Sequence, residues 1–134
     1  MRLTILSRSV RIASTARLVE AARARGHAVQ VLDPVQVEMH LDRDRAILYY
    51  RRRRLPSTDA VIPRIAQSIS TYGMAVVNQF ALQGVPLLNG TQGISGARNK
   101  MRCLQLLSAS GIRVPRTVMA AHPAGLKEMV KHAG

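Results

Sequence analysis

The sequence is short of cysteine, aromatic and acidic residues, and it has no long apolar run. Its single cysteine, Cys103, excludes an internal disulfide and a cysteine-based metal cluster. With no tryptophan and one phenylalanine, the core has to be built from aliphatic side chains and methionine. No apolar stretch approaches the ~20 residues that a membrane-spanning helix needs. The N-terminal apolar patch is interrupted by Arg8 and Arg11, unlike a signal peptide. We therefore expect a soluble, cytoplasmic protein without a membrane partner.

Acidic residues are scarce and unevenly placed. Seven Asp and Glu stand against 20 Lys and Arg, which gives a net charge of +13. None of the seven lies between Ala60 and Lys127. Basic surfaces attract polyanions through their long-range field. A complete enzyme seldom extends so far without a carboxylate, so we also expect that an acidic part of the protein lies beyond Gly134.

Strand and helix patterns alternate over residues 1–89. The hydrophobic content of 47% is enough for a core, and the βαβ order predicts a doubly wound α/β fold with a parallel-cored sheet flanked by helices on both faces. Strands are predicted at 3–6, 28–32, 60–65 and 85–89. Pro63 confines its strand to a strand end or an edge.

Two helices are predicted between these strands. The first runs from an N-cap at Ser14 to about Arg25 and stops at Gly26. Its inner face would carry Leu18, Val19 and Ala22. The second covers 68–84, with an apolar face at the helical spacing of Tyr72, Val76 and Phe80 and a stop at Gly84.

Residues 37–41 and 46–50 have the composition of extended strands. We expect two short strands or a hairpin there, laid on the edge of the sheet. From Gly90 the pattern changes to one helix after another, with a short helical turn at 91–97 and a helix at 99–110 that ends at Gly111. A further strand at 116–120 and a helix at 123–134 resemble the beginning of another domain, cut off.

Several short motifs occur in order along the chain. They are ILSR (5–8), LDP (32–34), DAVIPRI (59–65), YG (72–73), QF (79–80), ARNKMRCLQLL (97–107), and Gly111, Ile112 and Pro115. In this order and spacing the sequence resembles the N-terminal part of RimK-type ATP-grasp ligases. The resemblance implies a Rossmann-like pre-ATP-grasp domain at 1–89, connecting helices at 90–115 and a truncated ATP-grasp domain from 116 to 134. One departure is the run Arg51–Arg54, at a hairpin turn where the family has a glycine.

The resemblance also implies an activity. Such ligases phosphorylate a carboxylate with ATP and let an amine attack the acyl phosphate, which gives an amide, ADP and phosphate. RimK itself adds glutamate to the C-terminus of a small-subunit ribosomal protein. The implied cofactors are ATP and Mg²⁺, and the implied partners are glutamate or a similar amino acid and an acceptor protein tail, with ribosomal protein glutamylation as the reaction. Ligation of α-aminoadipate to a carrier protein, or of glutamate to a cofactor, stays open.

Lys100 matches the position of the first ATP-binding lysine of the family, so the resemblance implies that it contacts phosphate. The alternative is a solvated surface lysine. The second lysine, the catalytic residues and the metal ligands are expected beyond Gly134, so this chain alone should be inactive and hold neither ATP nor Mg²⁺. The four histidines, at 27, 40, 122 and 132, lack the spacing of metal ligands, and Cys103 is expected to be a small core residue.

Ligands of open α/β sheets bind at the carboxyl ends of the strands. Ser7 and Arg8 follow the first predicted strand, Arg64 closes another, and Asn89 ends the fourth. These four residues are therefore candidates for a substrate or phosphate cleft. Salt bridges of the arginines to Asp33 or Asp59, and a capping role for Asn89, are the alternatives.

Four consecutive arginines, Arg51, Arg52, Arg53 and Arg54, follow Tyr49 and Tyr50. They are candidates for contact with the acceptor or another polyanion, and a weak contact to nucleic acid is the second interpretation. A solvated charged hairpin is the third. A stand-alone basic module that binds RNA or the ribosome is accordingly the alternative to a ligase fragment. A homo-oligomer is compatible with the sequence.

Overall fold

A computed structural model describes residues 1–122 and 124–133 of the chain. The chain divides into two units, Met1–Ile94 and Ser95–Gly134, which are described separately below. Within the described residues, no helix is both long and apolar enough to cross a membrane.

A parallel sheet forms the centre of the first unit. Its strands are β1 (Arg2–Leu6), β2 (Ala28–Leu32) and β6 (Ala60–Pro63), in the order β2-β1-β6. Leu6 lies opposite Leu32 on one side and Pro63 on the other. Three of the four predicted strands are thereby confirmed.

The fourth predicted strand, at 85–89, is reduced to one parallel bridge between Val61 and Leu87. Two hydrogen bonds make it, from the Val61 amide to the Pro86 carbonyl and from the Leu88 amide to the Val61 carbonyl, each 2.9 Å long. Pro86 has no amide hydrogen to donate, so the pairing does not extend toward the preceding residues.

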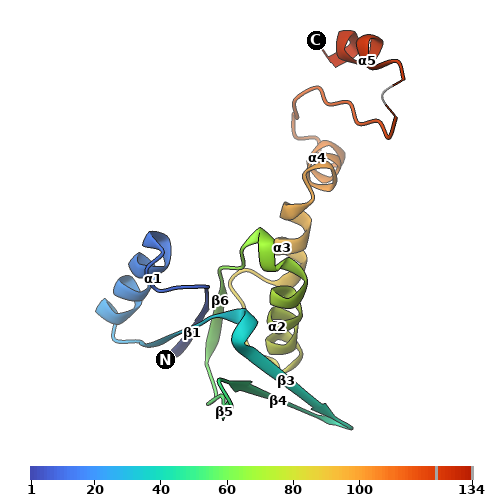
Figure 1. The fold of residues 1–134 in the computed structure, drawn as a ribbon. Coiled ribbons are helices and arrows are strands. Elements are labelled where there is room, and N and C mark those ends of the chain that lie inside the picture. Colours follow the sequence, from blue (N-terminus) through green and yellow to red (C-terminus); the bar gives the residue numbers. More distant parts are fainter. Residues whose placement is uncertain (123, 134) are drawn as a thin grey trace. The chain divides into compact units, whose positions relative to one another are not determined.

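Two helices cover the sheet, α1 (Ala13–Ala24) on one side and α2 (Ser70–Leu82) on the other (Figure 1). Side chains alternate between the faces of a strand. Leu6 therefore points toward the core around α2, and Ile5 points toward the face that α1 covers. The core on the α2 side contains Leu6, Leu32, Val37, Leu48, Val61, Val76, Val77 and Phe80.

The prediction that Ser14 caps α1 is wrong. The helix begins two residues earlier than predicted, with Ile12 at the N-cap position and no side-chain cap. Its buried residues are Thr15, Val19 and Ala22, whereas Leu18 is half-buried. Gly26 and Gly84 follow α1 and α2 with φ of 76° and 74°, as expected of left-handed helix stops.

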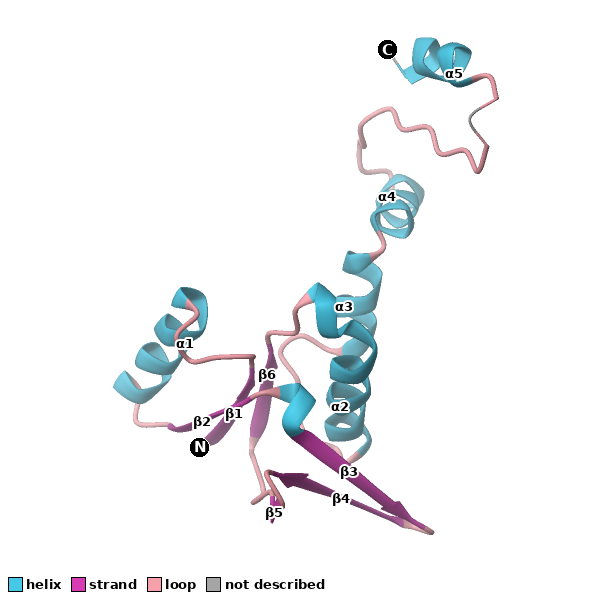
Figure 2. Ribbon diagram, in the orientation of Figure 1, coloured by secondary structure: helices cyan, strands magenta, loops and turns pink. Residues whose placement is uncertain are grey.

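The hairpin is confirmed, but its predicted place on the edge of the parallel sheet is wrong. Strands β3 (Val37–Asp42), β4 (Arg45–Tyr50) and the short β5 (Arg53–Arg54) form an antiparallel sheet of their own (Figure 2). Val37 and Leu48 on this sheet are buried in the same core as α2. The hairpin thus packs by its apolar face, and its period of two could not distinguish this from edge pairing.

Helix α3 (Thr91–Arg98) spans the division between the units and confirms the helical turn predicted at 91–97. The second unit contains α4 (Lys100–Ala109) and α5 (Leu126–Ala133). Residues 116–120 form no strand, which corrects that prediction, because no strand among the described residues of this unit pairs with them. The predicted helix at 123–134 corresponds to α5; its ends, Pro123 and Gly134, lie outside the described residues.

Candidate functional site at the carboxyl edge of the parallel sheet

The three parallel strands end at one edge, and polar residues follow each of them. Ser7 and Arg8 follow β1, Asp33 follows β2 and Arg64 follows β6. The structure thus brings together three of the four residues predicted for a cleft.

The hydroxyl and the amide of Ser7 both make hydrogen bonds inside the protein. Its side chain is buried, and its hydroxyl lies 2.9 Å from the hydroxyl of Thr15, which is also buried. Its amide donates to the Leu32 carbonyl at 2.9 Å. These bonds tie the end of β1 to α1 and to β2, which supports a structural role for Ser7; its predicted role in the cleft stays a prediction.

Arg8 forms the salt bridge that was the alternative to a ligand contact. Its Nε lies 3.2 Å from Asp33 Oδ2, with the Arg8 side chain half-exposed and Asp33 largely covered. Asp33 also accepts a hydrogen bond from the amide of Val35 at 3.3 Å. The pair involves Asp33 and not Asp59, whose carboxylate accepts from the Arg2 amide at the other end of β1.

Arg64 links the end of β6 to the first turn of α1. Its amide donates to the Leu6 carbonyl at 2.8 Å, and its guanidinium Nη2 donates to Ser14 Oγ at 3.0 Å. The side chain is exposed, and the first turn of α1 contains no acidic residue. The remaining guanidinium donors can therefore bind a carboxylate or a phosphate group. Ser14, predicted as a cap, is instead the partner of Arg64.

Asn89 is exposed and lies two residues beyond Leu87, which pairs with Val61 of β6. Because that pairing is parallel, Asn89 leaves the sheet toward the same carboxyl edge. Its predicted role in the cleft stays a prediction.

Lys100 belongs to the second unit and is the first residue of α4. It is exposed, and the helix begins with the Asn99 side chain accepting a hydrogen bond from the Arg102 amide at 2.9 Å. Met101, Leu104 and Leu107 are half-buried, and so is Cys103, whose thiol is free. The lysine is accessible to a phosphate, and its assignment to ATP stays a prediction.

The arginine run forms a turn that the sequence pattern did not specify. Arg51 and Arg52 both have positive φ, 50° and 65°, and connect β4 to the pair Arg53–Arg54. The Arg51 guanidinium lies 5.3 Å from the centre of the Tyr50 ring and donates to Gln36 Oε1 at 2.7 Å.

Among the residues that the structure describes, no group of three or more His, Cys, Asp or Glu could hold a metal ion. The exposed guanidinium groups at the carboxyl edge are suited to binding an anion.

Comparison with known proteins supports a specific family. The RimK PreATP-grasp domain family matches residues 1–94. The chain is 43% identical over 134 residues to a probable alpha-L-glutamate ligase of Vibrio parahaemolyticus and 44% identical to one of Saccharophagus degradans. Each alignment covers 100% of this chain and 44% of the relative, so the chain spans less than half the length of these relatives.

Solved structures agree on the fold. The ATP-grasp ligase PsnB, complexed with a minimal precursor, matches 99% of this chain and 50% of its own with a TM-score of 0.74 at 19% identity. A RimK domain ATP-grasp protein of Sphaerobacter thermophilus matches with a TM-score of 0.68 at 20% identity, over 100% of this chain and 47% of its own. The chain belongs to the RimK PreATP-grasp domain family.

Proposed function

We propose that this chain is the N-terminal part of an ATP-dependent carboxylate–amine ligase that attaches glutamate to the C-terminal tail of an acceptor protein. The observation that best supports this proposal is the similarity over all 134 residues to relatives named probable alpha-L-glutamate ligases. A ribosomal protein is the proposed acceptor, which places the reaction in the cytoplasm.

The proposed reaction has two steps. A carboxylate oxygen of the acceptor tail attacks the γ-phosphorus of ATP, which releases ADP and leaves an acyl phosphate. The amine of glutamate then attacks the acyl carbon, a proton leaves the nitrogen, and phosphate departs with its electron pair. The net change is one amide bond formed for each ATP cleaved.

Residues of this chain have binding roles in the proposal. Arg64, and Arg8 to the extent that its pairing with Asp33 leaves donors available, would hold a carboxylate or phosphate at the edge of the sheet. Asn89 would add a polar contact there, whereas the Ser7 hydroxyl is used internally. Lys100 would neutralise a phosphate of ATP as an exposed point charge.

The described residues do not fit a magnesium site, because no three potential ligands come together. Oxygen ligands for Mg²⁺ would have to come from a part of the ligase outside these residues.

The test uses the ligase that carries this chain, incubated with ATP, Mg²⁺, glutamate and a synthetic peptide of the acceptor tail. We expect ADP release and a peptide heavier by one glutamyl residue. Hydroxylamine should capture the acyl phosphate as a peptide hydroxamate in the absence of glutamate. Ligation of α-aminoadipate but not glutamate would indicate a ligase that acts on a carrier protein. ADP release without any peptide product would refute the proposal.

A further inference from the structure

A second concave site lies on the first unit, away from the carboxyl edge. It is a cavity of about 290 Å³ between the hairpin sheet and the C-terminal end of α2. Ser57 and Thr58, which precede β6, border it, so it lies near the amino end of that strand. Its volume is near the lower end of small-molecule pockets, enough for a side chain but not for a folded element.

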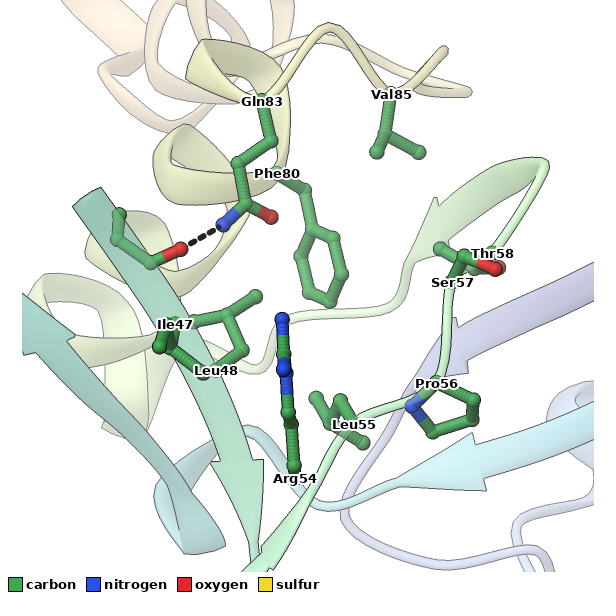
Figure 3. A pocket seen from close by; sticks show the side chains of 11 residues that line it. Ile47, Leu48, Arg54, Leu55, Pro56, Ser57, Thr58, Phe80, Gln83 and Val85 are labelled. Atoms are coloured by element: carbon green, nitrogen blue, oxygen red, sulfur yellow. Dashed lines mark hydrogen bonds between the residues drawn. The ribbon is translucent and has the colours of Figure 1, made fainter. Parts of the chain in front are cut away.

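The lining is mainly apolar and includes the charged Arg54 (Figure 3). Phe80 and Leu48 are buried, and Leu55 and Val85 are half-buried. Arg54 is exposed, and Figure 3 shows its side chain extending among these residues. The Gln83 amide nitrogen donates to the Ala46 carbonyl at 2.8 Å, which fixes the end of α2 against β4.

The guanidinium of Arg54 forms no ion pair with a carboxylate of the described residues. None of the ion pairs within residues 1–122 and 124–133 includes Arg51, Arg52, Arg53 or Arg54. A guanidinium beside apolar surface is well suited to a carboxylate, because it forms two parallel hydrogen bonds and is weakly hydrated.

The turn next to the cavity has a strained backbone, which suggests that its arginines have a function. Two-residue hairpin turns with positive φ at both central positions prefer Asn-Gly or Gly-Gly, yet Arg51 and Arg52 occupy them here. Conformations of this kind cost about 1–3 kcal/mol per residue and gather at functional sites. Arg54, which lines the cavity, thus directly follows a strained turn of further arginines.

We propose that this pocket docks an acidic peptide segment, with an aliphatic side chain of the peptide in the cavity and a neighbouring carboxylate on Arg54. The identification of that peptide as the acceptor chain rests on the proposed function, whereas the docking itself rests on the pocket. The site would hold the acceptor at a distance from the reacting atoms.

The aromatic contacts favour a peptide over RNA. Single-stranded RNA is held by bases stacked on open aromatic faces. The Tyr49 ring lies 4.5 Å from the His40 ring, centre to centre, and the Arg51 guanidinium covers the Tyr50 ring. Phe80 is buried at the floor of the cavity.

The test is fluorescence polarisation on the 134-residue chain without ATP. The probe is a fluorescein-labelled peptide of alternating glutamate and leucine, compared with peptides in which glutamine replaces glutamate or serine replaces leucine. Arg54→Gln should raise the Kd roughly tenfold, the effect of a charge-assisted hydrogen bond. Arg53→Gln is the matched control, because it removes the same charge next to the pocket without lining it, and should raise the Kd less than about threefold.

Binding should also weaken with either altered peptide and with added salt. Arg54→Lys keeps the charge but loses the bidentate geometry, so its Kd should lie between those of the parent and Arg54→Gln. Equal losses in the two glutamine variants, or equal binding of the glutamine peptide, would overturn the docking site. If a single-stranded RNA oligonucleotide bound more tightly than the acidic peptide, the ligand of this site would be RNA and the peptide proposal would be wrong. If peptide binding were lost while ligation by the full ligase stayed intact, only the docking site would be refuted. If the peptide bound but no ligation occurred, only the proposed function would be refuted.

Discussion

Arg52 is held in a backbone conformation that its side chain disfavours. At φ 65° it is the second of two adjacent left-handed residues in the turn between β4 and β5. Glycine adopts this conformation without steric cost. We expect Arg52→Gly to raise the free energy of unfolding by about 0.5–1 kcal/mol, since relief of strain exceeds the added entropy of the unfolded chain. Thermal melting checks the sign.

Arg53→Gly provides the control for that substitution. Arg53 lies in β5, one residue beyond the strained pair. Glycine within a strand costs about 0.5–1 kcal/mol, so this variant should melt below the parent. If Arg52→Gly and Arg53→Gly lowered the melting temperature equally, strain at Arg52 would not limit the stability of the parent protein.

The paired hydroxyls of Ser7 and Thr15 allow a test of whether Ser7 has a structural role. Both side chains are buried and their oxygens lie 2.9 Å apart. Ser7→Ala should cost about 1–3 kcal/mol because it leaves the Thr15 hydroxyl buried without that partner. The double variant Ser7→Ala/Thr15→Val removes both polar groups and should regain part of the loss. Chemical denaturation of the two single variants and the double variant gives the coupling; additive losses would contradict it.

Helix α2 contains a glycine that its packing requires. A Cβ added at Gly73 would lie 2.6 Å from Cγ2 of Ile65, which packs against the core. Alanine normally stabilises a helix by up to ~1 kcal/mol over glycine. Here we expect Gly73→Ala to lower the free energy of unfolding by about 1–2 kcal/mol, because overpacking outweighs propensity.

Gly93 in α3 is the matched control, since nothing lies within 4 Å of a Cβ added there. Gly93→Ala should therefore raise the local stability of α3 by a few tenths of a kcal/mol to ~1 kcal/mol. Amide hydrogen exchange measures that helix, and thermal melting measures Gly73→Ala. A stabilised Gly73→Ala protein would show that Ile65 moves aside at little cost.

Periodicity predicted the elements better than their assembly. The runs that became β1, β2 and β6 carry the branched apolar residues of buried parallel strands, and the glycines after α1 and α2 marked their ends. The place of the hairpin could not be predicted, because alternation defines an apolar face but not the surface that receives it. Helix α3 was expected as a short helical turn, because Gly93 and Gly96 lower helix propensity; packing of Ile94 against the core offsets that loss.

The candidate site was predictable in position but not in pairing. The rule that polar residues follow parallel strands located Ser7, Arg8 and Arg64. It did not show that Thr15 would take up the Ser7 hydroxyl, or that Ser14 would accept from Arg64. Both partners come from the first turn of α1, and hydrogen bonds of that kind depend on how a helix lies on its sheet.

The distribution of charge over the chain bears on nucleotide binding. No Asp or Glu occurs between Ala60 and Lys127, and the described residues offer no metal site. Without a metal, only exposed cations such as Lys100 attract the phosphates. ATP should therefore bind the 134-residue chain no more tightly than roughly millimolar. Calorimetric titration with and without Mg²⁺ checks this, and a magnesium-dependent micromolar affinity would place an ATP site within the chain.

The role of Lys100 can be tested in the full-length ligase that we propose. Its exposed ammonium at the start of α4 would contact ATP phosphate in both the ground state and the transition state, so it would supply mainly uniform binding. Lys100→Met keeps the apolar stem and removes the charge. The KM for ATP should rise by about ten- to a hundredfold, corresponding to about 1.5–3 kcal/mol for a charge-assisted contact, while folding is unchanged.

Lys127→Met is the matched control, because Lys127 is another exposed lysine near the start of a helix, α5. Its KM for ATP should stay at the parent value. Varying ATP and acceptor separately distinguishes Lys100 from Arg54, whose substitution should instead raise the KM for the acceptor. If Lys100→Met melted like the parent and kept the parent KM for ATP, the lysine would be a solvated surface residue and ATP would be held by other groups of the ligase.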